Sequence, residues 1–156
     1  MCINYRLMAK EPNPLSREEY FSVLKSHSLK ATPQRLAVHE AMLALGHASA
    51  DMVNDYIREH SSTRVTTASV YNILAQLALF GVYKHRLSAN NRMYFDVSPS
   101  RHIHLYDMVS NEYKDVLDDE LMDEIEGRLK RRRFKGYKVD GIDIQIICHP
   151  IARRKA

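Results

Sequence analysis

The spacing of apolar residues changes at Gly81, and this change constrains the fold more than any other feature of the sequence. Before Gly81, apolar residues recur at the three- and four-residue intervals of amphipathic helices. After it, residues 82–87 and 92–97 have the pattern of two short strands, and residues 88–91 can form the turn between them. Several helices followed by a β-hairpin are expected to form a winged helix.

Four predicted helices have recognisable starts and stops. A hydroxyl residue precedes each of them, where its side chain can accept a hydrogen bond from the first turn. These candidate caps are Ser16, Thr32, Ser49 and Thr66. Pro33 occupies the first helical position after Thr32, and Gly46 and Gly81 end the second and fourth helices.

The second half of the sequence predicts a different architecture. We expect strands at 103–108 and 112–116, a helix at 118–131 and a long strand at 138–149. The predicted fold class is therefore α+β, with an N-terminal winged helix-turn-helix domain and a small α/β domain. Proline and serine in the segment VSPS place the boundary there, which gives domains at 1–97 and 98–156.

Composition restricts the location of the protein and its metal chemistry. No apolar run approaches the roughly 20 residues of a membrane span, and residues 1–15 lack the apolar core of a signal peptide. We therefore expect a cytoplasmic protein with no membrane partner. Cys2 and Cys148 stand alone, which excludes a cysteine-rich zinc site, so a metal would need histidine and carboxylate ligands.

The charge pattern gives only a weak functional signal. The net charge is +4 with a pI near 9.1, which hints at an acidic partner. The acidic run at 118–126 and the basic run at 130–133 are typical of solvated surface, and we assign them no function.

The fourth predicted helix has the composition of a DNA-reading helix. Residues 66–81 contain no charged side chain, and the face opposite the apolar stripe carries small residues, hydroxyls and amides. Amides can bond base edges in the major groove, while the flanking Arg64, Lys84 and Arg86 can neutralise phosphates. The alternative is a helix buried on both faces. Including the start of the second helix, the predicted DNA contacts are Lys30, Gln34, Arg35, Arg64, Ser69, Tyr71, Asn72, Gln76 and Lys84.

A group of histidines and carboxylates suggests a second site. Side chains alternate along a strand, so His102 and His104 are expected to point the same way. Asp115 lies on the strand that the turn folds back beside them, while Asp96 ends the wing and His47 follows the second helix. This pattern fits a metal site or a polar strand face. The other histidines are expected on the surface or in packing contacts: His27, His39, His60, His85 and His149.

Five segments together resemble the ferric uptake regulator superfamily. They are LKATPQR (29–35), GHASADMV (46–53), TTASVYNILAQL (66–77), YFD (94–96) and HIH (102–104). The resemblance extends from about Tyr20 to Cys148. It implies a homodimeric, metal-responsive transcription factor that binds double-stranded operator DNA through its winged helix and dimerises through its C-terminal domain.

The resemblance also implies a regulatory metal site. The site of the peroxide-sensing branch falls on His47, Asp96, His102, His104 and Asp115, and all five residues are present. Aspartates at 96 and 115 are more similar to this branch than to the iron-uptake branch, where glutamates are usual. Such ligands suit Fe²⁺ or Mn²⁺, with Zn²⁺ as an alternative occupant, at one site per subunit.

The sequence departs from the family at a structural zinc site. Many members hold this zinc with two CxxC pairs, but here the first pair falls on Asp107 and Ser110, and the second on Cys148 and Ile151. The resemblance therefore predicts no structural four-cysteine zinc. The haem-linked iron-response regulators also lack these cysteines, and the segment 106–116 resembles them, so the branch stays open.

The leading hypothesis is a metal-dependent repressor that responds to peroxide through iron-catalysed oxidation of ligand histidines. A metal bound by both halves should fix the angle between them, so that two reading heads of a dimer match a palindromic operator. The same-class alternatives are an iron- or haem-responsive regulator and a zinc-responsive regulator. A small non-haem iron enzyme is the alternative from another class. Five ligands leave little room for a substrate, so we predict that the protein is not an enzyme.

Overall fold

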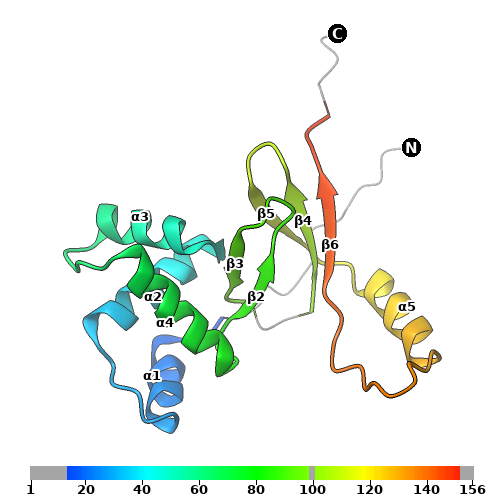
Figure 1. The fold of residues 1–156 in the computed structure, drawn as a ribbon, viewed down its shortest axis with the longest axis horizontal. Coiled ribbons are helices and arrows are strands. Elements are labelled where there is room, and N and C mark those ends of the chain that lie inside the picture. The colour runs from blue at the N-terminus through cyan, green and yellow to red at the C-terminus, as the bar shows by residue number, and fades with distance from the viewer. Residues whose placement is uncertain (1–13, 99–100, 152–156) are drawn as a thin grey trace. The chain divides into compact units, whose positions relative to one another are not determined.

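The computed structural model describes residues 14–98 and 101–151, which form an N-terminal unit and a C-terminal unit (Figure 1). The N-terminal unit comprises residues 14–98 and contains most of the helices. The C-terminal unit comprises residues 101–151 and contains a second sheet and one helix. No helix among the described residues is long and apolar enough to cross a bilayer.

The four predicted helices of the N-terminal unit are all present. They are α1 (Arg17–Ser26), α2 (Pro33–Leu45), α3 (Ala50–His60) and α4 (Thr67–Leu79). Each begins at its predicted cap, whose hydroxyl accepts a hydrogen bond from a backbone N–H in the first turn. Ser16 forms a complete capping box with Glu19, because the Glu19 carboxylate accepts from the Ser16 N–H in return.

The wing contains one more strand than the sequence predicted. The expected hairpin forms from β2 (Lys84–Leu87) and β3 (Met93–Asp96), and the short strand β1 (His47–Ala48) pairs with the other edge of β3. Two residues are too few to show a periodic pattern, so β1 could not be predicted locally. Gly46, at φ 71°, ends α2 and leads the chain directly into β1.

The core of the N-terminal unit lies between the helices and the wing. The apolar stripe of α4 is buried as predicted, with Val70, Leu74 and Leu77 fully enclosed. Burial of each leucine stabilises the unit by roughly 1.5–3 kcal/mol. His39 also belongs to this core, where its ring stacks on Tyr20 with centroids 3.9 Å apart, which confirms a packing role.

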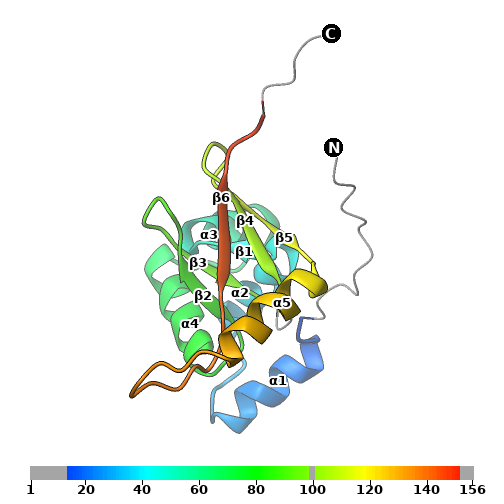
Figure 2. The same ribbon diagram turned by 90° about the vertical axis from the view of Figure 1, so that its right-hand side faces the viewer.

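The C-terminal unit is a small mixed sheet with one helix. It contains β4 (Ile103–Asp107), β5 (Glu112–Val116), α5 (Asp119–Lys130) and β6 (Ile144–Cys148). β4 is the central strand, antiparallel to β5 and parallel to β6 (Figure 2). The α+β fold class is therefore confirmed.

The last strand is shorter than predicted. We expected one strand over 138–149, but only residues 144–148 pair with β4. β4 is itself five residues long, so it offers five partner positions. The preceding residues, 138–143, include three charged residues and Gly141, and they form an irregular approach to the sheet.

Candidate metal centre and DNA-reading face

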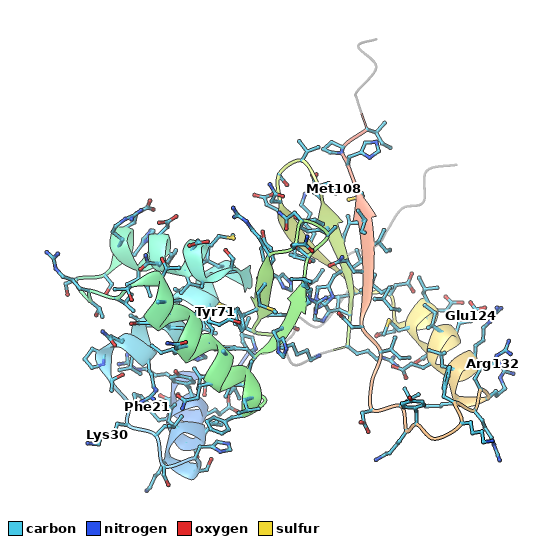
Figure 3. The ribbon with its side chains drawn as sticks, viewed as in Figure 1. Phe21, Lys30, Tyr71, Met108, Glu124 and Arg132 are labelled. Carbon is cyan, nitrogen blue, oxygen red and sulfur yellow. The ribbon has the colours of Figure 1, made fainter. Side chains whose placement is uncertain are left out.

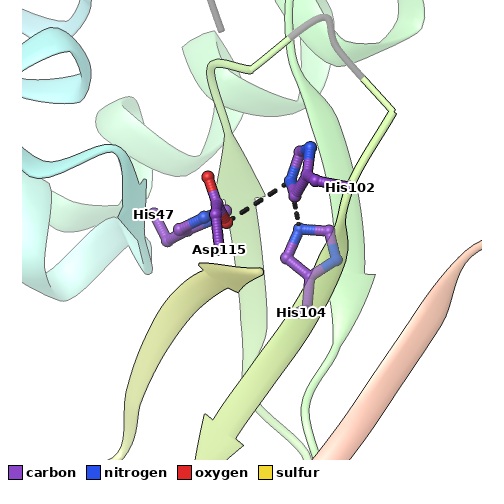
Figure 4. A group of neighbouring side chains, drawn as sticks. All are labelled: His47, His102, His104 and Asp115. Carbon is purple, nitrogen blue, oxygen red and sulfur yellow. Dashed lines mark hydrogen bonds and ion pairs between the residues drawn. The ribbon is translucent and has the colours of Figure 1, made fainter. Parts of the chain in front are cut away.

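Three predicted metal ligands lie together in the C-terminal unit. His102 precedes β4, His104 lies in β4, and Asp115 lies opposite His104 in β5. One ligand atom from each of these residues lies within 4.8 Å of the others. His102 Nε2 is 2.7 Å from His104 Nε2 and 3.4 Å from Asp115 Oδ1 (Figure 4). The alternation along β4 and the β4–β5 turn thus bring the three side chains to one place.

The geometry and burial of these residues fit a divalent metal ion. Two ligands of one ion, with bonds of about 2.0–2.2 Å, are separated by about 3–3.5 Å. The 3.4 Å between His102 and Asp115 lies in this range, whereas the two imidazole nitrogens, 2.7 Å apart, would have to separate slightly to bind one ion. His102 is 6% exposed and His104 is 2% exposed, so both imidazoles are withdrawn from water, while the Asp115 side chain is 24% exposed. Imidazole nitrogens and a carboxylate suit Fe²⁺, Mn²⁺ or Zn²⁺. The polar strand face that we considered as an alternative would leave the histidines exposed.

Asp143 is a residue of this centre that the sequence did not reveal. Its Oδ1 lies 3.5 Å from His104 Nδ1, which is the ring nitrogen on the other side from the nitrogen that faces His102. A carboxylate on the second nitrogen orients a metal-binding imidazole and increases its basicity. Gln145 is the β6 partner of His104, so Asp143 lies only two residues before that position. That parallel register was the missing signal.

The other two predicted ligands are neighbours within the N-terminal unit. His47 on β1 and Asp96 on β3 are directly paired residues, and His47 Nδ1 is 3.6 Å from Asp96 Oδ1. Asp96 is 1% exposed and also accepts a 2.7 Å hydrogen bond from the Ser98 N–H. The unpredicted strand β1 is therefore the element that brings His47 to Asp96.

Arg86 does not lie where we expected it. We grouped it with Arg64 and Lys84 as a cation that neutralises DNA phosphates, but its side chain is only 6% exposed. Its Nη2 lies 3.8 Å from Asp96 Oδ2. Burial in β2 beside this carboxylate removes Arg86 from the surface that DNA could contact.

One face of α4 is exposed, as a reading helix requires. Ala68, Tyr71 and Asn72 are exposed, and Figure 3 shows Tyr71 projecting from this helix. Ser69 and Gln76, on the same side, are half-buried. This exposure contradicts the alternative that α4 is buried on both faces.

The predicted contacts around α4 fall into two groups. Lys30, Arg64 and Lys84 are exposed cations. Arg35 is half-buried, and its Nη2 donates to Gln76 Oε1 at 3.1 Å while Nη1 donates to the Lys30 carbonyl at 2.9 Å. A third link joins the exposed Gln34 amide to the Arg64 carbonyl at 3.2 Å. Several predicted contact residues therefore also fix α2 against α4 and its flanking loop.

The positions that correspond to the family's CxxC cysteines have other interactions here. The Asp107 carboxylate accepts hydrogen bonds from the backbone N–H groups of Val109 and Ser110, at 2.8 and 3.4 Å. The bond from Val109, the larger cause, lowers the pKa of Asp107. Cys148 lies opposite Asp107 on β6 and donates to the Tyr106 carbonyl at 3.4 Å. Asp107 thus stabilises the β4–β5 turn.

This combination of a helical unit with a three-stranded wing, a mixed sheet and a histidine–aspartate centre defines a metal-responsive DNA-binding regulator. The model of the ferric uptake regulator family matches residues 26–146, and the chain belongs to this family. Its members are transcription regulators that bind DNA and act as dimers, so the prediction that the chain is not an enzyme is confirmed.

Solved structures support the same fold. The ferric uptake regulator of Vibrio cholerae has a TM-score of 0.71 at 19% identity, covering 84% of this chain and 99% of that one. The ferric uptake regulator of Helicobacter pylori has a TM-score of 0.69 at 19% identity, covering 88% and 94%. The peroxide stress regulator of Campylobacter jejuni has a TM-score of 0.61 at 25% identity, covering 86% and 98%. The comparison with curated proteins found no match to the chain.

Proposed function

We propose that the protein is a cytoplasmic, homodimeric, metal-dependent repressor that binds a palindromic operator. In this proposal, residues 1–97 read DNA and residues 98–156 dimerise. The observation that carries it is the convergence of His102, His104 and Asp115, two of them buried, in a member of a family of metal-responsive regulators. The Nε2 atoms of these two imidazoles lie 2.7 Å apart, within hydrogen-bonding distance, so both are directed to the place where an ion would bind.

We propose one regulatory ion per subunit, Fe²⁺ or Mn²⁺, with Zn²⁺ as an alternative occupant. Its ligands are His102, His104 and Asp115 from the C-terminal unit and His47 and Asp96 from the N-terminal unit. An ion bound by both units fixes their relative orientation, and the dimer then holds two reading heads at one separation. Without the ion that separation varies, and affinity for two half-sites falls.

A metal titration tests this ligand set. His104→Ala should reduce the Mn²⁺ affinity at least about tenfold, since one of the five proposed ligands is lost. His149→Ala is the matched control, because His149 is an exposed histidine just after β6. Equal affinities of the two variants for Mn²⁺ would remove His104 from the site.

For DNA recognition, we propose that the exposed face of α4 enters the major groove. Tyr71, Asn72, Ser69 and Gln76 provide the polar groups of that face. The exposed cations Lys30, Arg64 and Lys84 are suited to phosphates. Gln34 and Arg35, at the start of α2, complete the proposed contact set. The exposure of Tyr71 and Asn72 supports this assignment.

We further propose that peroxide is the signal. Both carboxylate ligands are aspartates, as the peroxide-sensing resemblance implies, and the Campylobacter jejuni peroxide stress regulator is 25% identical, against 19% for the two ferric uptake regulators compared above. A ferrous ion held by these ligands would supply the one-electron chemistry that cleaves the O–O bond of peroxide. In the net reaction, one peroxide oxygen replaces a ring C–H hydrogen of His47 or His102 as a hydroxyl group and the other oxygen leaves as water. The oxidised ring binds metal less well, so the site is weakened and DNA is released. An iron-, haem- or zinc-responsive regulator is the alternative.

Peptide mass spectrometry distinguishes these signals. The protein is loaded with Fe²⁺ or Mn²⁺ without oxygen and treated with a small excess of peroxide. We expect one added oxygen atom on His47 or His102 and loss of operator binding in the ferrous form. The Mn²⁺ form should keep unmodified histidines and its operator binding, because Mn²⁺ does not readily undergo this one-electron chemistry. A ferrous protein with intact histidines and intact DNA binding contradicts peroxide sensing and leaves the iron or haem sensor.

A further inference from the structure

A buried arginine lies beside one of the proposed metal ligands. The Arg86 side chain is 6% exposed and that of Asp96 is 2% exposed, with Nη2 and Oδ2 separated by 3.8 Å. A guanidinium group stays charged at any physiological pH. Burying this cation is unfavourable unless an anion lies close to it. Asp96 supplies such an anion.

The register of the wing explains why Arg86 reaches Asp96. In the β2–β3 pair, Lys84 is opposite Asp96 and Arg86 is opposite Tyr94. Lys84 and Arg86 therefore lie on the same side of β2, two residues apart. Lys84 is exposed to solvent, whereas Arg86 is buried. Of these two cations, only Arg86 is therefore enclosed in the protein.

The two oxygens of the Asp96 carboxylate have different neighbours in the N-terminal unit. Oδ1 accepts from the Ser98 N–H and lies 3.6 Å from His47 Nδ1. Oδ2 lies toward Arg86. Any cation that binds Asp96 must therefore share the carboxylate with the charge of Arg86.

We propose that Arg86 is a permanent counter-ion of Asp96 and lowers the affinity of this carboxylate for a divalent metal. The proposal rests on the function proposed above, in which Asp96 is a metal ligand. A divalent ion with two aspartates and three neutral imidazoles forms a neutral centre, and Arg86 adds one positive charge beside it. Repulsion between this charge and the metal is strong because both are withdrawn from water. Arg86 thereby raises the metal concentration at which the regulator responds.

Anaerobic Mn²⁺ titration against a competing chelator tests this role. Arg86→Gln removes the charge and keeps a long polar side chain, and we expect Mn²⁺ to bind about tenfold more tightly or better. Arg86→Lys retains a cationic side chain beside Asp96 and should tighten Mn²⁺ binding less than Arg86→Gln does. Arg92→Gln is the matched control, because Arg92 is an exposed arginine of the same wing, and it should not change the affinity.

The outcomes separate charge from packing. Unchanged or weaker Mn²⁺ binding by Arg86→Gln overturns the proposal. Weaker binding by both Arg86→Gln and Arg86→Lys means that Arg86 positions Asp96, which also overturns it. Circular dichroism melting verifies the fold of each variant, and Arg86→Met replaces the glutamine variant if that one does not fold, with the same tightening expected.

Asp96→Asn distinguishes this proposal from the function on which it rests. If Asp96→Asn leaves Mn²⁺ affinity unchanged, then Asp96 is not a ligand and the proposed ligand set fails. If Asp96→Asn weakens binding while Arg86→Gln has no effect, the ligand set stands and the counter-ion role alone fails.

Discussion

Exposed side chains on α4 differ from the surrounding cations in what they can distinguish on DNA. An amide such as Asn72 can pair with the edge of one base, whereas a guanidinium such as Arg64 binds any phosphate. Both residues are exposed, and they lie on α4 and just before it. In the proposed binding mode, sequence-specific and nonspecific binding would therefore depend on different residues of the same surface.

Paired measurements on specific and random DNA test this difference. Asn72→Ala should weaken specific binding by about 1–3 kcal/mol and leave random DNA almost unaffected. Arg64→Ala should weaken both and reduce the salt dependence, because one phosphate contact is lost. Both can be followed by fluorescence anisotropy at several salt concentrations. An equal loss on both DNAs for Asn72→Ala would argue against base reading.

His39 is a buried titratable residue in the core of the N-terminal unit. Its Nδ1 lies 2.8 Å from the Tyr83 hydroxyl and its Nε2 lies 3.2 Å from the Leu15 carbonyl. The carbonyl can only accept, so Nε2 donates to it and Nδ1 is free to accept from Tyr83. Burial lowers the pKa of His39 from its ordinary value of 6.5. The folded protein thus favours the neutral ring.

The lowered pKa predicts loss of stability in mild acid. The unfolded chain binds a proton at His39 more readily, so the stability contributed by the neutral ring is complete above pH 6.5 and falls as the pH drops from there through the folded pKa. Melting temperatures measured from about pH 7.5 to about pH 5.5 should fall more for the original protein than for His39→Phe. If the melting temperatures of the two proteins fall equally with pH, His39 does not contribute to the acid sensitivity.

At the residue level, local rules predicted side-chain direction but not long-range neighbours. Alternation along a strand correctly placed His102 and His104 on one side. The roles of Asp143 and Arg86 were missed because they depend on side-chain neighbours on adjacent strands, His104 for Asp143 and Asp96 for Arg86. No spacing within either segment specifies those pairings.

At the scale of elements, the starts of helices were the most predictable feature. Each N-terminal helix begins where a hydroxyl residue precedes the apolar pattern, and this signal is contained in a few consecutive residues. The sequence did not predict strand β1, and it predicted a longer strand than β6. Their lengths are set by the partners β3 and β4, which no local pattern of β1 or β6 reveals.

Arg101 joins helix α5 to the start of β4, the strand that carries the proposed metal ligand His104. Arg101 lies 2.8 Å from Asp123, 2.9 Å from Glu126 and 3.9 Å from Asp119. These acids share one face of α5, since they are four and three residues apart. Part of the acidic run that we assigned to solvated surface therefore anchors the segment that carries His102.

Removal of Arg101 should weaken this anchor moderately. Because Arg101 is 38% exposed and two of its partners are largely exposed, we expect Arg101→Ala to lower the free energy of unfolding only slightly. The difference should shrink in about 1 M salt. Arg128→Ala, which loses a single exposed pair with Glu124, is the control for urea denaturation. A loss from Arg101→Ala that salt does not reduce would indicate packing rather than ion pairing.

For the whole molecule, the substituted CxxC positions bear on what holds the C-terminal unit together. Asp107 binds the turn after β4, and Cys148 bonds the Tyr106 carbonyl across the sheet. Ile103, Tyr106 and Met122 are buried in this unit. These contacts are independent of any cysteine-bound zinc.

Chelation should therefore leave the protein folded and dimeric. We expect a strong chelator to remove the regulatory ion and reduce operator affinity while the far-ultraviolet circular dichroism and the sedimentation coefficient stay unchanged. Addition of Mn²⁺ should restore operator binding. Unfolding or dissociation after chelation would reveal a structural metal that the absence of CxxC pairs led us to discount.

The sequence order of the strands has a consequence for synthesis on the ribosome. Every strand of the N-terminal sheet and its four helices precede residue 99, so this unit can fold as soon as that segment has emerged. The second sheet must wait, because β6, the last strand among the described residues, pairs with β4, the first strand of its unit. A nascent chain that stalls before Ile144 would therefore carry a folded N-terminal unit and an unfinished C-terminal sheet, with one edge of β4 open to wrong partners.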